Sequence, residues 1–181
     1  GRSALEIGQW TPPAGRGKRE TIYLIPAEKD AAFELIDDAY NANPTSMAAA
    51  FEVLAAATPT DDIGRIQKGR RIAILGDMLE MGADEHAIHA SLAKDPNLAI
   101  AHKVHCVGPL MAALHAALGG GQRGECFENA DAAVSSAHHL VDPGDVVLVK
   151  GSKGSQVSRV VDALRSLGHP PAAAAAHGRS F

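Results

Sequence analysis

Short apolar runs and longer amphipathic runs alternate along most of the chain. The apolar runs are rich in Val, Ile and Leu, and in the clearest of them, 72–75 and 146–149, every position is apolar. A strand that is apolar on both faces is typical of a parallel sheet covered by helices on each side. The pattern therefore predicts an α/β fold, a Rossmann-like three-layer sandwich with a mostly parallel sheet.

The expected elements follow from this pattern and from the glycines and prolines that interrupt it. Helices are predicted where apolar residues recur at intervals of three and four, as for Met47, Phe51 and Leu54. Ligands of such folds bind outside the carboxyl ends of the strands, so the residues there are the candidates for chemistry. The predicted strands are 21–25, 33–36, 71–75, 103–107, 125–127 and 145–150, and the predicted helices are 44–57, 84–94, 109–118, 130–140 and 156–167.

Both ends of the chain depart from this alternation. Residues 3–9 have the pattern of a helix end, and the prolines and glycines of 10–17 break regular structure, so 1–17 are predicted to end one domain and to form a linker or hinge. The segment 169–181 contains five consecutive alanines and is predicted to be a disordered tail. The domain itself is expected to span 18–168.

Composition and charge narrow the class of protein. Of 181 residues, 46% are hydrophobic, 21% are charged and 34 are alanine, and the formal net charge is −4. The sequence has no basic stripe and no apolar run long enough to span a bilayer, so neither nucleic acid nor membrane insertion is expected. Two cysteines cannot build a disulfide scaffold, which favours a cytoplasmic protein with reduced thiols.

The densest polar cluster, 37–44 (Asp-Asp-Ala-Tyr-Asn-Ala-Asn-Pro), lies between a predicted strand and a predicted helix. Asn43 before Pro44 is a natural helix N-cap with proline at the first helical position. Capping does not explain the two carboxylates, Tyr40 or Asn41. A carboxylate can accept hydrogen bonds from a ribose diol, and an amide both donates and accepts. A ligand site and a well-capped turn both remain open.

Three other positions carry candidate chemistry. Arg16 lies between two glycines and suits a phosphate, with a solvated loop arginine as the alternative. Asp77 follows a predicted strand, where a ligand and a tight turn explain it equally well. Lys150 at the tip of the last strand could bind an anion or extend toward solvent. His86 and His89 lack the spacing and partners of a metal site, so no metal ligand is predicted.

Four motifs occur in an order that one known family shares. They resemble the C-terminal domain of the Mur ligases of bacterial peptidoglycan synthesis, over about residues 4–167. The second and third motifs are similar to those of the members that add D-alanyl-D-alanine. The motifs are 15–17 (Gly-Arg-Gly), 36–47 (Ile-Asp-Asp-Ala-Tyr-Asn-Ala-Asn-Pro-Thr-Ser-Met), 74–82 (Ile-Leu-Gly-Asp-Met-Leu-Glu-Met-Gly) and 149–153 (Val-Lys-Gly-Ser-Lys).

The resemblance implies a three-domain, ATP-dependent, amide-forming ligase of which this chain is the last domain. The first domain would bind UDP-N-acetylmuramoyl-tripeptide, and the central domain would hold the phosphate loop and most of the magnesium coordination. The third domain would close over ATP and position D-alanyl-D-alanine. Residues 1–17 would then be the end of the central ATPase domain and the hinge. The chain is expected to be inactive alone, with its own missing N-terminal and central domains as partners.

The resemblance also implies roles for single residues. Arg16 would reach the ATP phosphates on closure, and Asp38 would hold the ribose. The expected ATP-binding residues are Arg16, Asp38, Tyr40, Asn41 and Asn43, and the dipeptide-side candidates are Asp77, Lys150 and Ser152.

Two alternatives remain open. One is a free-standing Rossmann-class nucleotide-binding or regulatory module, and tight NAD binding would favour it. The other is a sister amide ligase that uses a different amino acid.

Overall fold

A single six-stranded sheet, in the order β1-β2-β6-β3-β4-β5, forms the centre of the molecule. The computed structural model describes residues 14–169, and the predictions for 1–13 and 170–181 lie outside them. β1 pairs antiparallel with β2, and all other neighbours are parallel. The strands are β1 (Lys18–Tyr23), β2 (Ala32–Asp38), β3 (Arg71–Gly76), β4 (Lys103–Val107), β5 (Arg123–Phe127) and β6 (Val146–Lys150).

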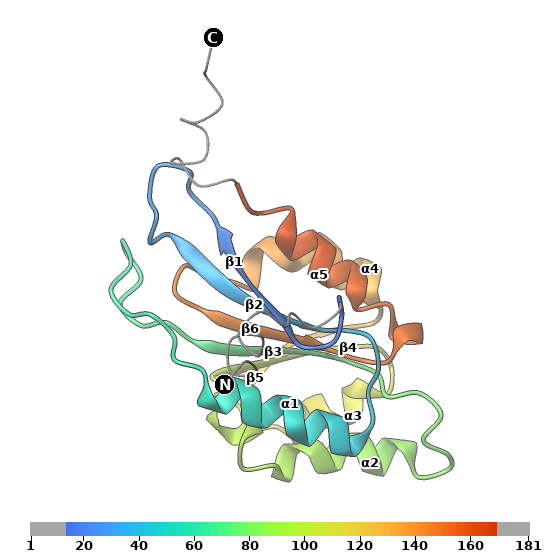
Figure 1. Cartoon of the computed structure of the whole chain (residues 1–181). Coiled ribbons are helices and arrows are strands. Elements are labelled where there is room, and N and C mark those ends of the chain that lie inside the picture. The colour runs from blue at the N-terminus through green and yellow to red at the C-terminus, as the bar shows by residue number, and fades with distance from the viewer. Residues whose placement is uncertain (1–13, 170–181) are drawn as a thin grey trace, which may run out of the picture.

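Helices cover both faces of this sheet (Figure 1). α1 (Pro44–Ala56), α2 (Glu85–Ser91) and α3 (Met111–Ala117) lie on one face, and α4 (Ala130–Ser136) and α5 (Ser158–Arg165) lie on the other. The predicted three-layer sandwich with a mostly parallel sheet is confirmed. Short 3-10 turns complete the described chain: η2 (Leu92–Lys94), η3 (Leu98–Ile100), η4 (Ala137–His139) and η5 (Lys153–Ser155).

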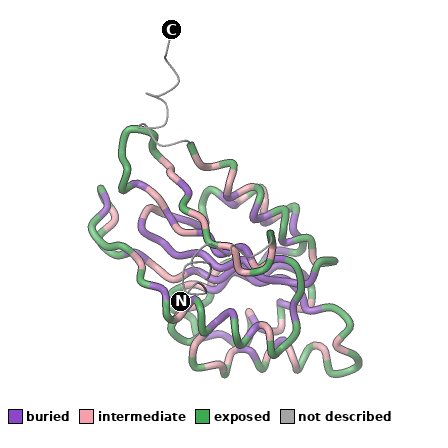
Figure 2. The backbone as a smooth tube through the Cα atoms, in the orientation of Figure 1, coloured by how far each residue is buried: buried purple, intermediate pink, exposed green. Residues whose placement is uncertain are grey.

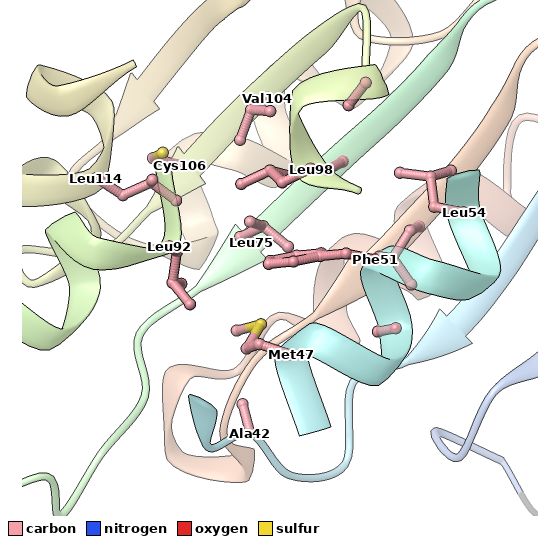
Figure 3. Close-up of a cluster of buried hydrophobic side chains, with 14 of the residues drawn as sticks. Ala42, Met47, Phe51, Leu54, Leu75, Leu92, Leu98, Val104, Cys106 and Leu114 are labelled. Carbon is pink, nitrogen blue, oxygen red and sulfur yellow. The ribbon is translucent and has the colours of Figure 1, made fainter. Parts of the chain in front are cut away.

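The apolar strands divide their side chains between two cores. In β6, Val146 and Leu148 join the core under α1–α3, whereas Val147 and Val149 join the core under α4 and α5. Figure 2 shows the buried residues concentrated in the central strands. Figure 3 shows the first core, where Phe51 of α1 packs above the sheet. Strands that are apolar on both faces are what this two-sided burial requires.

Most predicted elements are present, with shifted ends. The predicted helix at 156 starts at Ser158, because Gln156 has a left-handed backbone with φ of 60° and separates α5 from a 3-10 turn. The first strand begins at Lys18 because its pairing with β2 extends to Asp37. The helices predicted at 84–94 and 130–140 each tighten into a 3-10 turn in their last residues.

The parallel strands place the polar motifs at one edge of the sheet. The register pairs Asp38 with Lys150 and Leu75 with Lys150, so the ends of β2, β6 and β3 lie side by side. This carboxyl edge is where ligands of such folds bind. Within residues 14–169, no helix is long and apolar enough to cross a membrane.

Candidate functional site

One hollow at the carboxyl edge gathers most of the predicted ATP-binding residues. We call it the Arg16 hollow, and its volume is about 290 Å³. Of the five predicted ATP-binding residues, only Asn43 is absent from its lining. The lining residues are Gly15, Arg16, Asp38, Tyr40, Asn41, Ser46 and Lys150. Segments far apart in sequence, the chain before β1 and the ends of β2 and β6, thus meet around one space.

Lys150 and Asp38 form an ion pair at the base of this hollow. Lys150 Nζ donates to Asp38 Oδ2 and to the backbone oxygen of Asn41, each at 2.9 Å. The Lys150 side chain is only 4% exposed, whereas that of Asp38 is 23% exposed. Burial raises the pKa of Asp38, and the hydrogen bond and charge of Lys150 act against that rise. A buried ion is stable in a protein only when it is paired and hydrogen-bonded in this way.

Arg16 lies over the face of Tyr40, with its guanidinium carbon 4.2 Å from the ring centroid. Gly15 and Gly17 on either side have φ of 79° and 83°, a conformation that favours glycine. Among residues 14–169, the Arg16 guanidinium has no hydrogen-bond or ion-pair partner. It contacts the Tyr40 ring through this cation–π interaction. A planar cation with unused donors beside the Lys150 ammonium suits an anion with several oxygens.

The two asparagines of the motif shape the turn before α1. Asn41 Oδ1 accepts from the backbone N–H of Ala42 at 2.9 Å. Asn43 Oδ1 accepts from the N–H of Ser46, and the Ser46 hydroxyl accepts from the N–H of Asn43, which is a capping box. The predicted N-cap is therefore confirmed. Asn41 reaches the hollow, where its backbone oxygen also helps to hold Lys150.

A second hollow of about 290 Å³, the Asp77 hollow, lies at the ends of β3 and β4. Asp77 is buried, and its Oδ1 accepts from the backbone N–H of Met111 at 2.8 Å. Burial raises the pKa of this carboxyl, and backbone hydrogen bonds act against that rise. A Cβ on Gly108 would come within 2.5 Å of the carboxylate, so glycine is required there. Arg159 also lines the hollow and forms an ion pair with Asp131.

Ser152 connects the loops between the two hollows. Its buried hydroxyl accepts from the backbone N–H of Leu79 at 2.9 Å, and its own N–H donates to the backbone oxygen of Asp77 at 3.1 Å. The structure therefore separates the three dipeptide-side candidates. Asp77 lines its own hollow, Lys150 lines the Arg16 hollow, and Ser152 ties the loops together.

Of the two histidines on α2, His89 is part of the core and His86 is exposed. His89 is fully buried, its Nε2 accepts from the backbone N–H of Met78, and its Nδ1 contacts the backbone oxygen of Glu85. Cys106 is also buried, which raises its thiol pKa to about 12. In the part of the chain that the structure describes, no three His, Cys, Asp or Glu residues are grouped to hold a metal ion.

A family comparison agrees with this geometry. Residues 25–153 match the family described as "Mur ligase, glutamate ligase domain". The match includes Asp38, Tyr40, Asp77 and Lys150. The chain belongs to the Mur ligase family.

Named relatives and solved structures support this assignment of the Mur ligase domain. The chain is 34% identical over 147 residues to the UDP-N-acetylmuramoyl-tripeptide–D-alanyl-D-alanine ligase of Escherichia coli K12, covering 80% of this chain and 30% of the relative. The enzyme of that name from Mycobacterium tuberculosis H37Rv is 33% identical, with 72% and 28% covered. This Mur ligase domain therefore spans less than a third of these curated relatives.

Among solved structures, a MurF ligase from Thermotoga maritima in complex with ADP has a TM-score of 0.67. It is 20% identical, with 90% of this chain and 33% of that chain covered, so it shows the shared fold. A D-alanyl-D-alanyl ligase from Acinetobacter baumannii has a TM-score of 0.59 at 26% identity, with 87% and 30% covered. The expected fold and family of the Mur ligase domain are confirmed.

Sequence reasoning missed two features of this Mur ligase domain. Asp37 is the more deeply buried of the two adjacent aspartates and bonds with Arg165 of α5 rather than facing the Arg16 hollow. Arg159 lines the Asp77 hollow, although only its place on the last helix was visible in the sequence. Alternating strand faces could have separated Asp37 from Asp38, because successive side chains point to opposite faces.

Proposed function

We propose that this chain is the C-terminal domain of an ATP-dependent ligase that adds D-alanyl-D-alanine to UDP-N-acetylmuramoyl-tripeptide. The relatives with that name support the substrate pair, and the ADP named for the Thermotoga maritima ligase supports the nucleotide. The observation that carries the proposal is the convergence of Arg16, Asp38, Tyr40 and Lys150 on one hollow at the carboxyl edge.

The Arg16 hollow is proposed to receive the nucleotide when the longer protein closes. Arg16 and Lys150 supply two cations for phosphate oxygens, and the Asp38 oxygen that does not bind Lys150 can accept from a ribose hydroxyl. Tyr40 holds Arg16 in place through the face of its ring and lines the same hollow. Asn41 and Asn43 support the turn, so their contribution is to shape the site.

The Asp77 hollow is proposed as the dipeptide side. Asp77 and Glu128 offer negative charge to an ammonium group, and Arg159 offers a cation to a carboxylate. The Arg159–Asp131 pair is exposed, so exchanging Asp131 for a ligand carboxylate costs little. Ser152 fixes the loops that separate this hollow from the nucleotide.

The reaction proposed for the whole ligase has two steps. The tripeptide carboxylate takes the γ-phosphoryl group of ATP, which forms an acyl phosphate and releases ADP. The dipeptide amine then attacks the acyl carbon, and the tetrahedral intermediate loses phosphate and a proton to give the amide. The contribution of this domain is positional, because it holds the amine near the acyl phosphate and excludes water on closure.

Magnesium is assigned to the longer protein rather than to this domain. Asp37 and Asp38 are already bound by Arg165 and Lys150, so they do not form a donor set that fits a divalent cation. We therefore propose no magnesium ligand among residues 14–169.

Reconstitution tests the proposal. The chain alone should show no ATP-dependent amide formation, and adding the two preceding domains as a separate polypeptide should produce it, with D-alanyl-D-alanine as the acceptor. Magnesium-dependent turnover by the chain alone would contradict the assignment of the phosphate loop and the magnesium site to the other domains. If the reconstituted enzyme used a different amino acid instead, D-alanyl-D-alanine would not be the acceptor substrate.

A further inference from the structure

The glycine-flanked segment that carries Arg16 is firmly attached to the sheet. Gly15 N–H donates to Asp37 Oδ2 at 3.0 Å, and Gly17 N–H donates to the Asp37 backbone oxygen at 2.7 Å. Tyr40 N–H donates to the backbone oxygen of Gly15 at 3.0 Å. The segment therefore has hydrogen bonds on both sides of Arg16, although its sequence is that of a flexible linker.

Asp37 is the centre of this attachment. Its side chain is only 5% exposed, and its Oδ2 accepts from both Gly15 N–H and an Arg165 guanidinium nitrogen, each at 3.0 Å. Its Oδ1 accepts from Ala39 N–H at 3.3 Å. Arg165 Nε also donates to Glu20 at 2.7 Å, so one arginine of α5 bridges β1 and β2. We call Asp37 and Arg165 the clasp.

The clasp and the Arg16 hollow are on opposite sides of one loop. Asp38 lines the Arg16 hollow, whereas Asp37 and Arg165 line a separate hollow on the α5 side. Gly15 and Tyr40 line both hollows, and an added Cβ on Gly15 would lie 3.1 Å from the Tyr40 Cβ. Releasing Gly15 from Asp37 thus also frees the backbone that stacks Arg16 on Tyr40.

We propose that Asp37 and Arg165 are positioning residues, which fix the segment 15–17 to this domain so that Arg16 moves with it as one body. In this arrangement the glycines do not bend during closure. Their positive φ angles allow the tight docking that sets the Arg16 guanidinium in advance. A preset cation binds more tightly than one that must be ordered at the moment of binding. The link to ATP rests on the proposed function, whereas the attachment itself does not.

Nuclear magnetic resonance on this chain tests the attachment directly. In the wild type, the Arg16 side-chain protons should be shifted upfield by the Tyr40 ring, and the Gly15 and Gly17 amides should exchange slowly. Asp37→Ala should abolish the upfield shift and speed both exchange rates by about tenfold or more, as loss of 1.4 kcal/mol would. Arg165→Met should also weaken the upfield shift and speed the exchange of both amides. Arg165→Lys should keep most of the wild-type protection from exchange.

The matched control is Arg19→Met, which removes an exposed ion pair of β1 with Glu34 and should leave the Arg16 signals unchanged. A folded Asp37→Ala protein that keeps the upfield shift and slow exchange would overturn the proposal. If Asp37→Ala does not fold, unchanged Arg16 signals in Arg165→Met would overturn it instead.

Kinetics of the longer ligase test the consequence for ATP. Asp37→Ala should raise the KM for ATP by about tenfold while kcat and the KM for the UDP substrate stay within about twofold. The double variant Arg16→Ala with Asp37→Ala should have the same KM for ATP as Arg16→Ala alone. If the two residues acted independently, their effects on this KM would multiply. Additive effects would overturn the positioning role. A wild-type protein that does not use ATP would refute the proposed function and leave the resonance result standing.

Discussion

The two ends of β6 carry ion pairs that differ in one instructive way. At the amino end, the Asp145 side chain is 0% exposed and accepts from the N–H, Nε and a terminal nitrogen of Arg70 and from the N–H of Asp142. At the carboxyl end, Lys150 has two partners and its partner Asp38 remains partly exposed beside the Arg16 hollow. The first pair has used its hydrogen-bonding capacity, and the second has not.

This difference separates a structural pair from a candidate binding pair. The Arg70–Asp145 pair closes the amino edge, where it joins the loops that precede β3 and β6. The Lys150–Asp38 pair lies at the edge where parallel sheets bind ligands, and it keeps charge beside open space. Replacing a residue of the Arg70–Asp145 pair should therefore lower the stability of the fold. Replacing a residue of the Lys150–Asp38 pair should weaken nucleotide binding.

The largest expected effect is on the amino-end pair. Asp145→Ala removes a fully buried carboxylate and leaves the partly exposed Arg70 side chain and two backbone N–H groups without their acceptor, which should lower the free energy of unfolding by about 3–5 kcal/mol. Denaturant unfolding of this chain measures the loss. Asp142→Ala is the matched control, because Asp142 is the exposed partner of the same arginine and should cost about 1 kcal/mol or less. Equal losses in the two variants would contradict the comparison.

Replacing the carboxyl-end lysine should give a smaller loss of stability and a larger loss of function. Lys150→Met leaves the Asp38 carboxylate without its ion pair and should cost about 1–3 kcal/mol in unfolding free energy. In the longer ligase it should also raise the KM for ATP by about tenfold or more. Steady-state kinetics at saturating UDP substrate measure this. An unchanged KM for ATP would show that Lys150 has only a structural role.

The smallest effect concerns the pH dependence of Asp77. Burial raises the pKa of this carboxyl above its ordinary value of 3.8, so the folded state binds the proton more tightly than the unfolded state. The stabilising contribution is complete below pH 3.8 and is lost as the pH rises through the folded pKa. Asp77→Asn should therefore gain stability relative to the wild type between about pH 3.5 and pH 7. Unfolding curves at both pH values that show no such gain would contradict the assigned burial.

The sequence predicted the layers, and it singled out the candidate residues that line the Arg16 hollow, because both depend on local patterns. Runs such as 146–149 are apolar at every position, which is typical of strands buried on both faces. The pairing of Lys150 with Asp38 could not be predicted, since it joins residues 112 apart and depends on the register of β2 with β6. The hydrogen bond between Gly15 and Asp37 could not be predicted either, because a glycine-rich sequence is equally compatible with a flexible linker.

Nucleotide affinity of the longer ligase tests the central claim most directly. Calorimetric titration with ADP would compare the wild type with Arg16→Ala and with Arg19→Ala, an exposed arginine of β1 that lies outside the Arg16 hollow. We expect Arg16→Ala to weaken ADP binding by about tenfold or more and Arg19→Ala to leave it unchanged. Equal affinities for the wild type and Arg16→Ala would contradict the assignment of this hollow to the nucleotide.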